Sequence, residues 1–454
     1  MKKGDIIDVI IAEQKYPAEG IAWHEGKRIK VQRGLKEQKI SVKILKSGSK
    51  RMKAKNMEVV ERASYEINPP CSFSDFCGGC IFPTVPYDMQ LQMKEKEMLD
   101  QMKQGEVEIE EYFGFVGCDA RTGYRNKMEY TFGDREKGGE MALGMHQMGR
   151  HMDIVTVSDC AICHNDFNKI VEVTLDFFVK SNIPFYHKKE RTGFQRNLIL
   201  RRGENTGEIL VNLVTTSQHQ LNEKQFVEAL LSLKLENAIV GINHIINDGI
   251  ADFVYCDSMK TLYGREYYLE SVLGLSFQVS PLSFFQTNTK AAEKLYQEVV
   301  QMIEEIEGKT IFDLYCGTGT ISQIMARKAK QVIGIEIVEE AIEAAKKNAE
   351  INNLKNCHFI CGDVFEALDR VKEKPDVIVL DPPRVGVLPK ALNKILNYQV
   401  KTIVYISCNP LTLAQNLKEM QEQGYQVKRL KGLDNFPGTK HIECVALIEK
   451  KDAL

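Results

Sequence analysis

The C-terminal part of the chain alternates regularly between apolar runs and amphipathic stretches of helical periodicity. The apolar runs lie at residues 310–314, 332–336, 358–360, 376–381 and 402–408, and the clearest intervening helix is expected at 338–352. Apolar strands that alternate with helices are typical of a doubly wound parallel sheet, both faces of which are covered by helices. We therefore expect a Rossmann-like α/β domain over residues 281–454.

Two more strands, at 427–430 and 442–448, follow without a helix between them. Consecutive strands of this kind predict an antiparallel hairpin that closes the sheet. A five-stranded parallel sheet that ends in such a hairpin is typical of methyltransferases, whereas nicotinamide-binding sheets usually end differently.

The rest of the sequence predicts two further domains, since 454 residues are too many for one compact core. Residues 1–60 contain short strands with glycines between them, which favours a small β-barrel of the oligonucleotide-binding kind. Residues 61–280 mix strands and helices and predict a mixed α/β central domain. Within it, 196–202 and 208–214 are expected to form a hairpin.

The predicted barrel is basic, although the whole chain has a formal net charge of -2. Its 60 residues hold 15 lysines and arginines against 7 aspartates and glutamates. A solvated face is the ordinary explanation of such a cluster, but the acidity of the remainder favours a partner with phosphates. Basic residues from Lys27 to Lys55 alternate with apolar ones, and Trp23 is the main candidate for base stacking. We therefore expect affinity for nucleic acid rather than sequence readout.

The sequence shows no targeting or membrane segment. No uncharged apolar run approaches the roughly 18 residues that a membrane span needs. The N-terminus carries Asp5 and Asp8 where a signal peptide would be apolar. These features predict a cytoplasmic protein with no membrane partner, and nothing indicates an obligate protein partner.

A glycine turn follows the first strand of the predicted parallel sheet, in Asp313-Leu-Tyr-Cys-Gly-Thr-Gly-Thr. Gly317 and Gly319 let the backbone turn sharply and approach a ligand closely. Glu336, at the end of the second strand, is placed to accept hydrogen bonds from the ribose hydroxyls of an adenosine. With no third glycine at the helix start, the turn favours an adenosine without a diphosphate. Asp363 fits an adenine contact and a helix N-cap equally well.

Cys408 ends the fifth predicted strand, in Ser407-Cys-Asn-Pro. A single cysteine on a strand is usually an inert core residue. This one lies at the C-terminal edge of the sheet, just before a helix whose N-terminus would favour a thiolate. Asp381-Pro-Pro-Arg follows the fourth strand at the same edge. Glu443, in the closing hairpin, is an acid at that edge, although its alternating neighbours also suit a salt-bridged surface strand.

Together these motifs resemble the RNA uracil-5-methyltransferases of the RumA and TrmA type, over nearly the whole chain. The resemblance rests on Phe284-Phe-Gln-Thr-Asn, Asp313-Leu-Tyr-Cys-Gly-Thr-Gly-Thr, Asp381-Pro-Pro-Arg, Ser407-Cys-Asn-Pro and His441-Ile-Glu. It implies an S-adenosylmethionine-dependent methyltransferase domain and a TRAM-like, RNA-binding barrel. By resemblance, Cys408 adds to C6 of uracil and Glu443 removes the C5 proton. The methyl donor is expected to contact Gln286, Tyr315, Glu336 and Asp381.

Three of the twelve cysteines lie close together, in Cys71-Ser-Phe-Ser-Asp-Phe-Cys77-Gly-Gly-Cys80. In a reducing compartment such a group indicates metal binding or catalysis rather than disulfides. Zinc held by Cys77, Cys80, Cys160 and Cys163 is one interpretation. The resemblance instead implies a [4Fe–4S] cluster on Cys71, Cys77, Cys80 and Cys160, as in the branch of the family that modifies 23S ribosomal RNA.

Other functions fit part of these features. Amino-group methylation uses Asp-Pro-Pro followed by an aromatic residue, but Arg384 stands in that place. Cytosine-5 methylation also uses a cysteine, but it does not account for the cysteine group or for Glu443. A tRNA substrate is the alternative within the family. A non-catalytic RNA-binding factor in ribosome assembly is the alternative outside enzymes.

Overall fold

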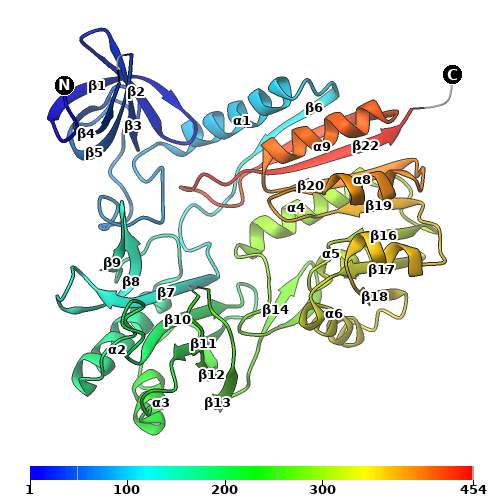
Figure 1. Cartoon of the computed structure of the whole chain (residues 1–454). Helices are drawn as coiled ribbons and strands as arrows, with labels where there is room; N and C mark the ends of the chain where they lie inside the picture. Colours follow the sequence, from blue (N-terminus) through cyan, green and yellow to red (C-terminus); the bar gives the residue numbers. More distant parts are fainter. Residues whose placement is uncertain (49, 252, 452–454) are drawn as a thin grey trace.

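The structure is a computed structural model that describes residues 1–48, 50–251 and 253–451. The chain forms a small N-terminal barrel, a central sheet and a larger C-terminal sheet (Figure 1). Among the described residues, no helix has both the length and the apolar character needed to cross a bilayer.

The N-terminal barrel is closed and five-stranded. Its strands are β1 (Ile6–Lys15), β2 (Glu19–His24), β3 (Lys27–Gln32), β4 (Lys39–Ser47) and β5 (Arg51–Glu61). They are joined in the order β1-β2-β3-β5-β4, and β1 pairs with β4 to close the barrel. Ile29 and Val42 are buried inside, whereas Lys43 and Lys53 are exposed. The predicted alternation of apolar and basic residues is confirmed, and the basic side chains face outward.

The C-terminal sheet carries the predicted parallel strands and the two strands of the predicted hairpin. They are β16 (Thr310–Leu314), β17 (Gln331–Glu336), β18 (Cys357–Cys361), β19 (Val377–Leu380), β20 (Thr402–Ser407), β21 (Tyr425–Leu433) and β22 (Glu443–Lys450). The order runs β18-β17-β16-β19-β20-β22-β21. The first five strands in this order are parallel, and β22 is antiparallel to both of its neighbours. The predicted Rossmann-like sheet with a closing antiparallel hairpin is confirmed.

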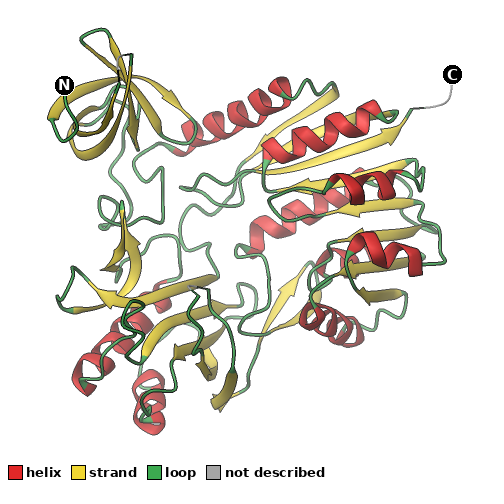
Figure 2. Cartoon of the chain, viewed as in Figure 1, coloured by secondary structure: helices red, strands yellow, loops and turns green. Residues whose placement is uncertain are grey.

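Helices cover both faces of this sheet (Figure 2). They are α1 (Tyr87–Gln104), α4 (Thr289–Met302), α5 (Thr320–Ala326), α6 (Glu339–Ile351), α7 (Val364–Ala367), α8 (Pro389–Leu396), α9 (Pro410–Glu422) and the short 3-10 helix η1 (Leu368–Arg370). Helices α1, α8 and α9 share one buried core with Phe312 and Leu314 on one face. Helices α4 and α5 pack against Ile311 on the other. Successive residues of β16 thus alternate between two cores, as in other parallel strands buried on both faces.

An eighth strand, β6 (Ile109–Val116), pairs in parallel with β21 at the edge of the C-terminal sheet. Strand β6 lies outside the range 281–454 predicted for this domain and within the range predicted for the central domain. Most of its side chains are exposed or half-buried. Its exposure therefore differs from that of inner strands such as β19, which is buried at every position.

The central sheet has seven strands in the order β13-β12-β11-β10-β7-β8-β9. Their bounds are β7 (Lys127–Asp134), β8 (Met141–Gln147), β9 (Arg150–Thr156), β10 (Gln195–Arg202), β11 (Glu208–Thr215), β12 (Ala238–Ile246) and β13 (Ser258–Gly264). Helices α2 (Asn165–Ser181) and α3 (Glu223–Leu231) pack on it, and the hairpin β14 (Tyr268–Val272) and β15 (Leu275–Val279) leads to α4. The predicted hairpin of 196–202 with 208–214 is confirmed, since β10 and β11 are antiparallel.

Candidate active site

The glycine turn after β16 leaves open space beside its backbone. Gly317 has φ 54°, and a Cβ built there would meet nothing within 4 Å. Tyr315 has φ 67°, a left-handed conformation that costs a non-glycine residue roughly 1–3 kcal/mol and that clusters at functional sites. The turn therefore has the clearance that a bound ligand needs, and Tyr315 lies at its start.

Glu336, the last residue of β17, links the glycine turn to the start of the next helix. Its Oε2 accepts the Gly317 N–H at 3.2 Å, and its Oε1 accepts the Ile337 and Val338 N–H groups at 2.8 and 3.0 Å. A carboxylate has about four acceptor positions. One position thus stays available to a further hydrogen-bond donor.

Asp313 and Asp381 lie near the carboxyl ends of β16 and β19, which are neighbouring strands. Asp313 is buried and accepts a hydrogen bond from Ser322 Oγ, whereas its Oδ1 has no partner among the described residues. Burial raises the pKa of Asp313 to about 7. Burial, together with the charge of Asp313, raises the pKa of the half-buried Asp381 to about 7. The two carboxyls form an acidic pair that favours a cationic group beside it.

Gln286 lies in the loop between β15 and α4, which contacts the glycine turn. Thr318 Oγ1, in the glycine turn, donates to the Phe284 carbonyl at 3.5 Å. Asn126 Nδ2 donates to the Gln286 carbonyl at 3.3 Å. The structure therefore brings this loop against the glycine turn.

Asp363 caps α7. Its carboxylate accepts the Phe365 N–H at 2.9 Å, which is the geometry of a helix N-cap. Of the two interpretations that its position allowed, the structure supports the cap.

The register of β20 and β22 brings Cys408 and Glu443 together. Ser407 faces Cys444 in this antiparallel pair. Because Cys408 follows Ser407 and Glu443 precedes Cys444, they occupy the next facing positions. Cys408 is half-buried and Glu443 is 5% exposed. Glu443 is therefore not the surface salt-bridge residue that its alternating neighbours also suited.

The charges around the pair raise both pKa values. Burial, with a smaller contribution from Asp381, raises the pKa of Glu443 to about 8. Burial and the Glu443 charge raise the pKa of the Cys408 thiol, whereas the charge and hydrogen bond of Arg384 lower it. Helix α9 does begin at Pro410, after its N-cap Asn409. That this helix N-terminus favours a Cys408 thiolate stays a prediction, and burial and the charges of Glu443 and Asp381 act against it by raising the thiol pKa.

No role in the site was predicted for Arg384 or His441, although both lie in motifs that carry the resemblance. The Asn409 side chain donates to the Arg384 carbonyl at 2.9 Å and so ties the loop after β19 to the end of β20. Burial and the charge of Arg384 lower the pKa of His441 to about 4, so that the imidazole is neutral. The available signal was the arginine that follows Asp381-Pro-Pro.

The predicted cysteine ligands lie in one region. Burial and the charges of the other three thiols, from Cys160, Cys77 and Cys71, raise the pKa of Cys80. Cys163 is instead 4% exposed, packs in the core of the central sheet and hydrogen-bonds Tyr130 Oη at 3.6 Å. Among the described residues, no three His, Cys, Asp or Glu side chains are arranged as ligands of a single metal ion.

The sheet order, the glycine turn and the carboxylate at the end of β17 define the domain as that of an S-adenosylmethionine-dependent methyltransferase. Residues 87–451 match the family described as tRNA (Uracil-5-)-methyltransferase. The chain belongs to this family.

Relatives agree with this assignment. The chain is 46% identical over 454 residues to a Clostridium tetani protein named as an uncharacterized RNA methyltransferase, with 100% of both chains covered. It is 43% identical over 451 residues to a similarly named protein of Caldanaerobacter subterraneus, covering 99% of this chain and 100% of that one. The chain is also similar to the crystal structure of Pyrococcus abyssi tRNA (uracil-54, C5)-methyltransferase in complex with S-adenosyl-L-homocysteine. The two structures superpose with a TM-score of 0.77 at 25% sequence identity, over 97% of this chain and 100% of that chain. The protein is thus an RNA (uracil-5-)-methyltransferase that uses S-adenosylmethionine.

Proposed function

We propose that this enzyme methylates C5 of a uridine in 23S ribosomal RNA, with Cys408 as the covalent nucleophile and Glu443 as the closing base. The observation that carries the proposal is the register of β20 and β22, which puts the thiol and the carboxyl on facing positions. A uracil ring between them and the glycine turn would meet both groups. The target base must leave its stack to reach them.

The residues at the strand ends fit the methyl donor. Glu336 has an acceptor position left for the ribose, Tyr315 begins the glycine turn, and the loop that contains Gln286 lies against this turn. The unpartnered Oδ1 of Asp313 and the neighbouring Asp381 suit the cationic amino-acid end of the donor. We assign donor binding to Gln286, Tyr315, Glu336 and Asp381. When bound, S-adenosylmethionine supplies an electrophilic methyl group.

Cys408 makes C5 reactive. Its sulfur forms a bond to C6 of uracil, and the electrons of the C5–C6 double bond move toward O4 as an enolate, which makes C5 a nucleophile. Arg384, hydrogen-bonded to the thiol, stabilises the thiolate that attacks. Once C5 carries the methyl group, the ring is saturated and still bonded to Cys408.

Glu443 then closes the reaction. Its carboxylate takes the C5 proton, the electrons of the C–H bond re-form the C5–C6 double bond, and the C6–S bond breaks to release the thiolate. A raised pKa suits this step, because the carboxylate is a stronger base than an exposed glutamate and stays buried beside the ring.

The cysteine group supports the ribosomal substrate. Four thiols lie in one region, and Gly79 and Gly438 leave clearance beside Cys77 and Cys80. This arrangement fits a [4Fe–4S] cluster on Cys71, Cys77, Cys80 and Cys160. Bound there, the cluster would cross-link the cysteine loop to the central domain. The barrel and the cysteines together resemble the branch that modifies 23S RNA. The second candidate is a tRNA uridine, favoured by the similarity to the Pyrococcus abyssi tRNA (uracil-54, C5)-methyltransferase.

A covalent trap tests the chemistry. Glu443→Gln, incubated with S-adenosylmethionine and transcribed 23S RNA, is expected to accumulate a protein–RNA adduct on a denaturing gel. Cys408→Ala is expected to form none. The double variant Glu443→Gln/Cys361→Ala, which removes an exposed cysteine at the end of β18, should still trap RNA.

The same assay identifies the RNA. Adduct and 5-methyluridine are expected on 23S RNA and not on a tRNA transcript, whereas the reverse result would replace the ribosomal substrate with tRNA. An adduct formed by Cys408→Ala would remove Cys408 from the mechanism. Absence of methylation on either RNA would favour the non-catalytic RNA-binding alternative.

A further inference from the structure

The loop that precedes Glu443 accepts hydrogen bonds from several distant segments of the chain. This loop, residues 434–442, joins β21 to β22 and is called here the base loop. Tyr16 of the barrel donates to the Lys440 carbonyl at 2.5 Å, and Tyr124 donates to the Pro437 carbonyl at 2.7 Å. The Gly438 carbonyl accepts the N–H groups of Ile81 and Phe82, just after the cysteine loop, at 2.9 and 3.0 Å. The base loop is therefore fastened by segments far apart in sequence.

Its first residue forms a buried ion pair with α1. Lys94 Nζ lies 2.7 Å from Asp434 Oδ1, and both side chains are 0% exposed. The same ammonium donates to the Phe436 carbonyl at 3.1 Å, and Asp434 Oδ1 also accepts the Phe436 N–H at 2.9 Å. One lysine thus fixes both the side chain and the backbone at the start of the base loop.

Stability alone is a weak reason for such a pair. Removing two charges from water costs free energy that their attraction often only offsets, and apolar replacements of similar volume are commonly as stable. A buried pair of this kind is better suited to holding one conformation. The conformation held here is that of the chain leading to Glu443.

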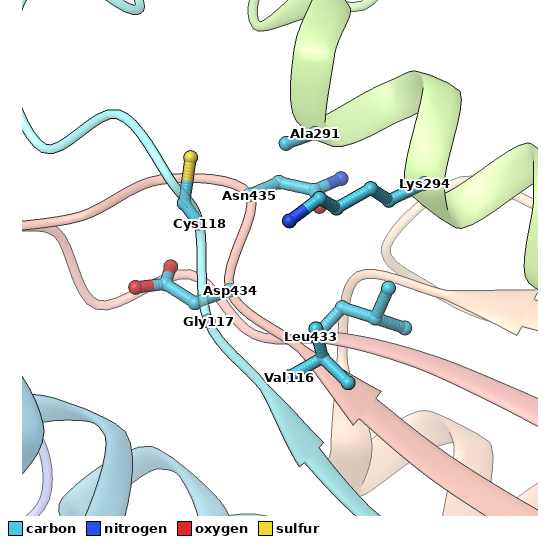
Figure 3. A pocket seen from close by; sticks show the side chains of 8 residues that line it. All are labelled: Val116, Gly117, Cys118, Ala291, Lys294, Leu433, Asp434 and Asn435. Atoms are coloured by element: carbon cyan, nitrogen blue, oxygen red, sulfur yellow. The ribbon is translucent and has the colours of Figure 1, made fainter.

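A small cavity lies on the other side of Asp434. Its volume is about 10 Å³, and Asp434, Asn435 and Cys118 are among its lining residues (Figure 3). Asp434 Oδ2 and Asn435 Nδ2 are buried and have no hydrogen-bond partner among the described residues.

We propose that Lys94 is a positioning residue for uracil-5-methylation, which holds the base loop so that the Glu443 carboxylate faces C5 of the covalent intermediate. The inference rests on the proposed function. Lys94 touches neither RNA nor methyl donor in this role and acts through Asp434 and Phe436. Its loss therefore slows the elimination step and leaves formation of the Cys408–C6 bond largely intact.

Two variants separate positioning from folding. Lys94→Met leaves Asp434 buried and unpaired, which can prevent folding. Lys94→Met/Asp434→Asn carries no buried charge, and the new amide oxygen can still accept the Phe436 N–H, so that the melting temperature is expected to stay near that of the wild type. The double variant still lacks the bond from Lys94 to the Phe436 carbonyl. Lys96→Met, on an exposed position of α1, is the matched control.

The readout is the fate of the adduct in single-turnover reactions with 23S RNA. The folded double variant is expected to accumulate adduct and to release methylated RNA on the order of tenfold to a hundredfold more slowly, as displaced catalytic groups do. Adduct should form at close to the wild-type rate, and Lys96→Met should release RNA normally. Wild-type release by the folded double variant would overturn the inference. If Glu443→Gln also fails to trap RNA, the proposed function itself fails.

Discussion

Nη2 of Arg384 lies 2.7 Å from Nδ1 of His441. A guanidinium can only donate, so Nδ1 is the acceptor and the imidazole proton is on Nε2. The lowered pKa of His441 keeps the ring neutral and able to accept. The contact fixes the orientation of Arg384, whose charge and hydrogen bond act on the Cys408 thiol.

Replacing Arg384 should make Cys408 less reactive. Arg384→Met removes the group that lowers the thiol pKa, so the thiolate fraction falls. Alkylation of Cys408 by iodoacetamide at pH 7 should therefore slow severalfold. Mass spectrometry of the Cys408 peptide measures the rate, and Lys440→Met controls for the loss of a nearby exposed charge. An unchanged rate would exclude thiolate stabilisation by Arg384.

Glu443 should make stability depend on pH. Its carboxyl has a folded pKa of about 8 against an ordinary value of 4.5, so between these values the folded state holds a proton that the unfolded state has lost. Stability from this group is full below pH 4.5 and declines as the pH rises toward 8. Glu443→Gln lacks this decline. The melting temperature of the variant minus that of the wild type should therefore rise from pH 5 to pH 8.

The control for that comparison is Glu449→Gln, on the same strand and half-exposed. Its difference from the wild type should stay constant over the same range. A constant difference for Glu443→Gln as well would mean that its carboxyl is ionised in the folded enzyme.

Glu336 should carry much of the affinity for the nucleoside. Hydrogen bonds to charged groups contribute about 1.5–3 kcal/mol, so Glu336→Gln should weaken binding of S-adenosylhomocysteine by roughly tenfold to a hundredfold. Isothermal titration calorimetry measures the affinity. Asp363→Asn keeps a good N-cap at α7 and should bind nearly as the wild type does. A larger loss for Asp363→Asn would assign the adenosine contact to Asp363 instead.

The cluster assignment predicts which cysteines retain iron. After anaerobic purification the wild type should be brown, and Cys71→Ser and Cys160→Ser should lose most of their iron and sulfide. Cys163→Ala should keep both, because the Cys163 thiol packs in the central core and bonds Tyr130. Colourless wild-type protein with stoichiometric zinc would replace the cluster by the metal that four thiolates also suit.

The sequence predicted the parts of the fold that are determined by one local pattern, such as a continuous run of apolar residues. Val377–Leu380 is buried at every position, and a continuous apolar run between helices indicates a parallel strand. Cys408 and Glu443 were predicted because strand ends meet at one edge of such a sheet. The two cysteines Cys160 and Cys163 were not separable, because spacing does not tell which thiol enters a core.

Other features depend on tertiary pairing that no local pattern records. Strand β6 has exposed or half-buried side chains, and its place beside β21 comes from backbone pairing and from contacts with distant residues, such as the Lys428–Glu110 ion pair. The base loop is held largely through its carbonyl and N–H groups, which every residue has. The burial that raises the pKa of Cys408 was not predicted, because the depth of burial cannot be read from a strand end.

The pairing of β6 with β21 has a consequence for how the chain can be made. Strand β6 leaves the ribosome early, yet its partner is translated more than 300 residues later, so the catalytic sheet cannot be finished until translation is nearly complete. A truncated product that starts at residue 281 would expose the edge of β21 as a template for self-association. Expression of the methyltransferase domain alone should therefore give inclusion bodies unless the segment with α1 and β6 is supplied.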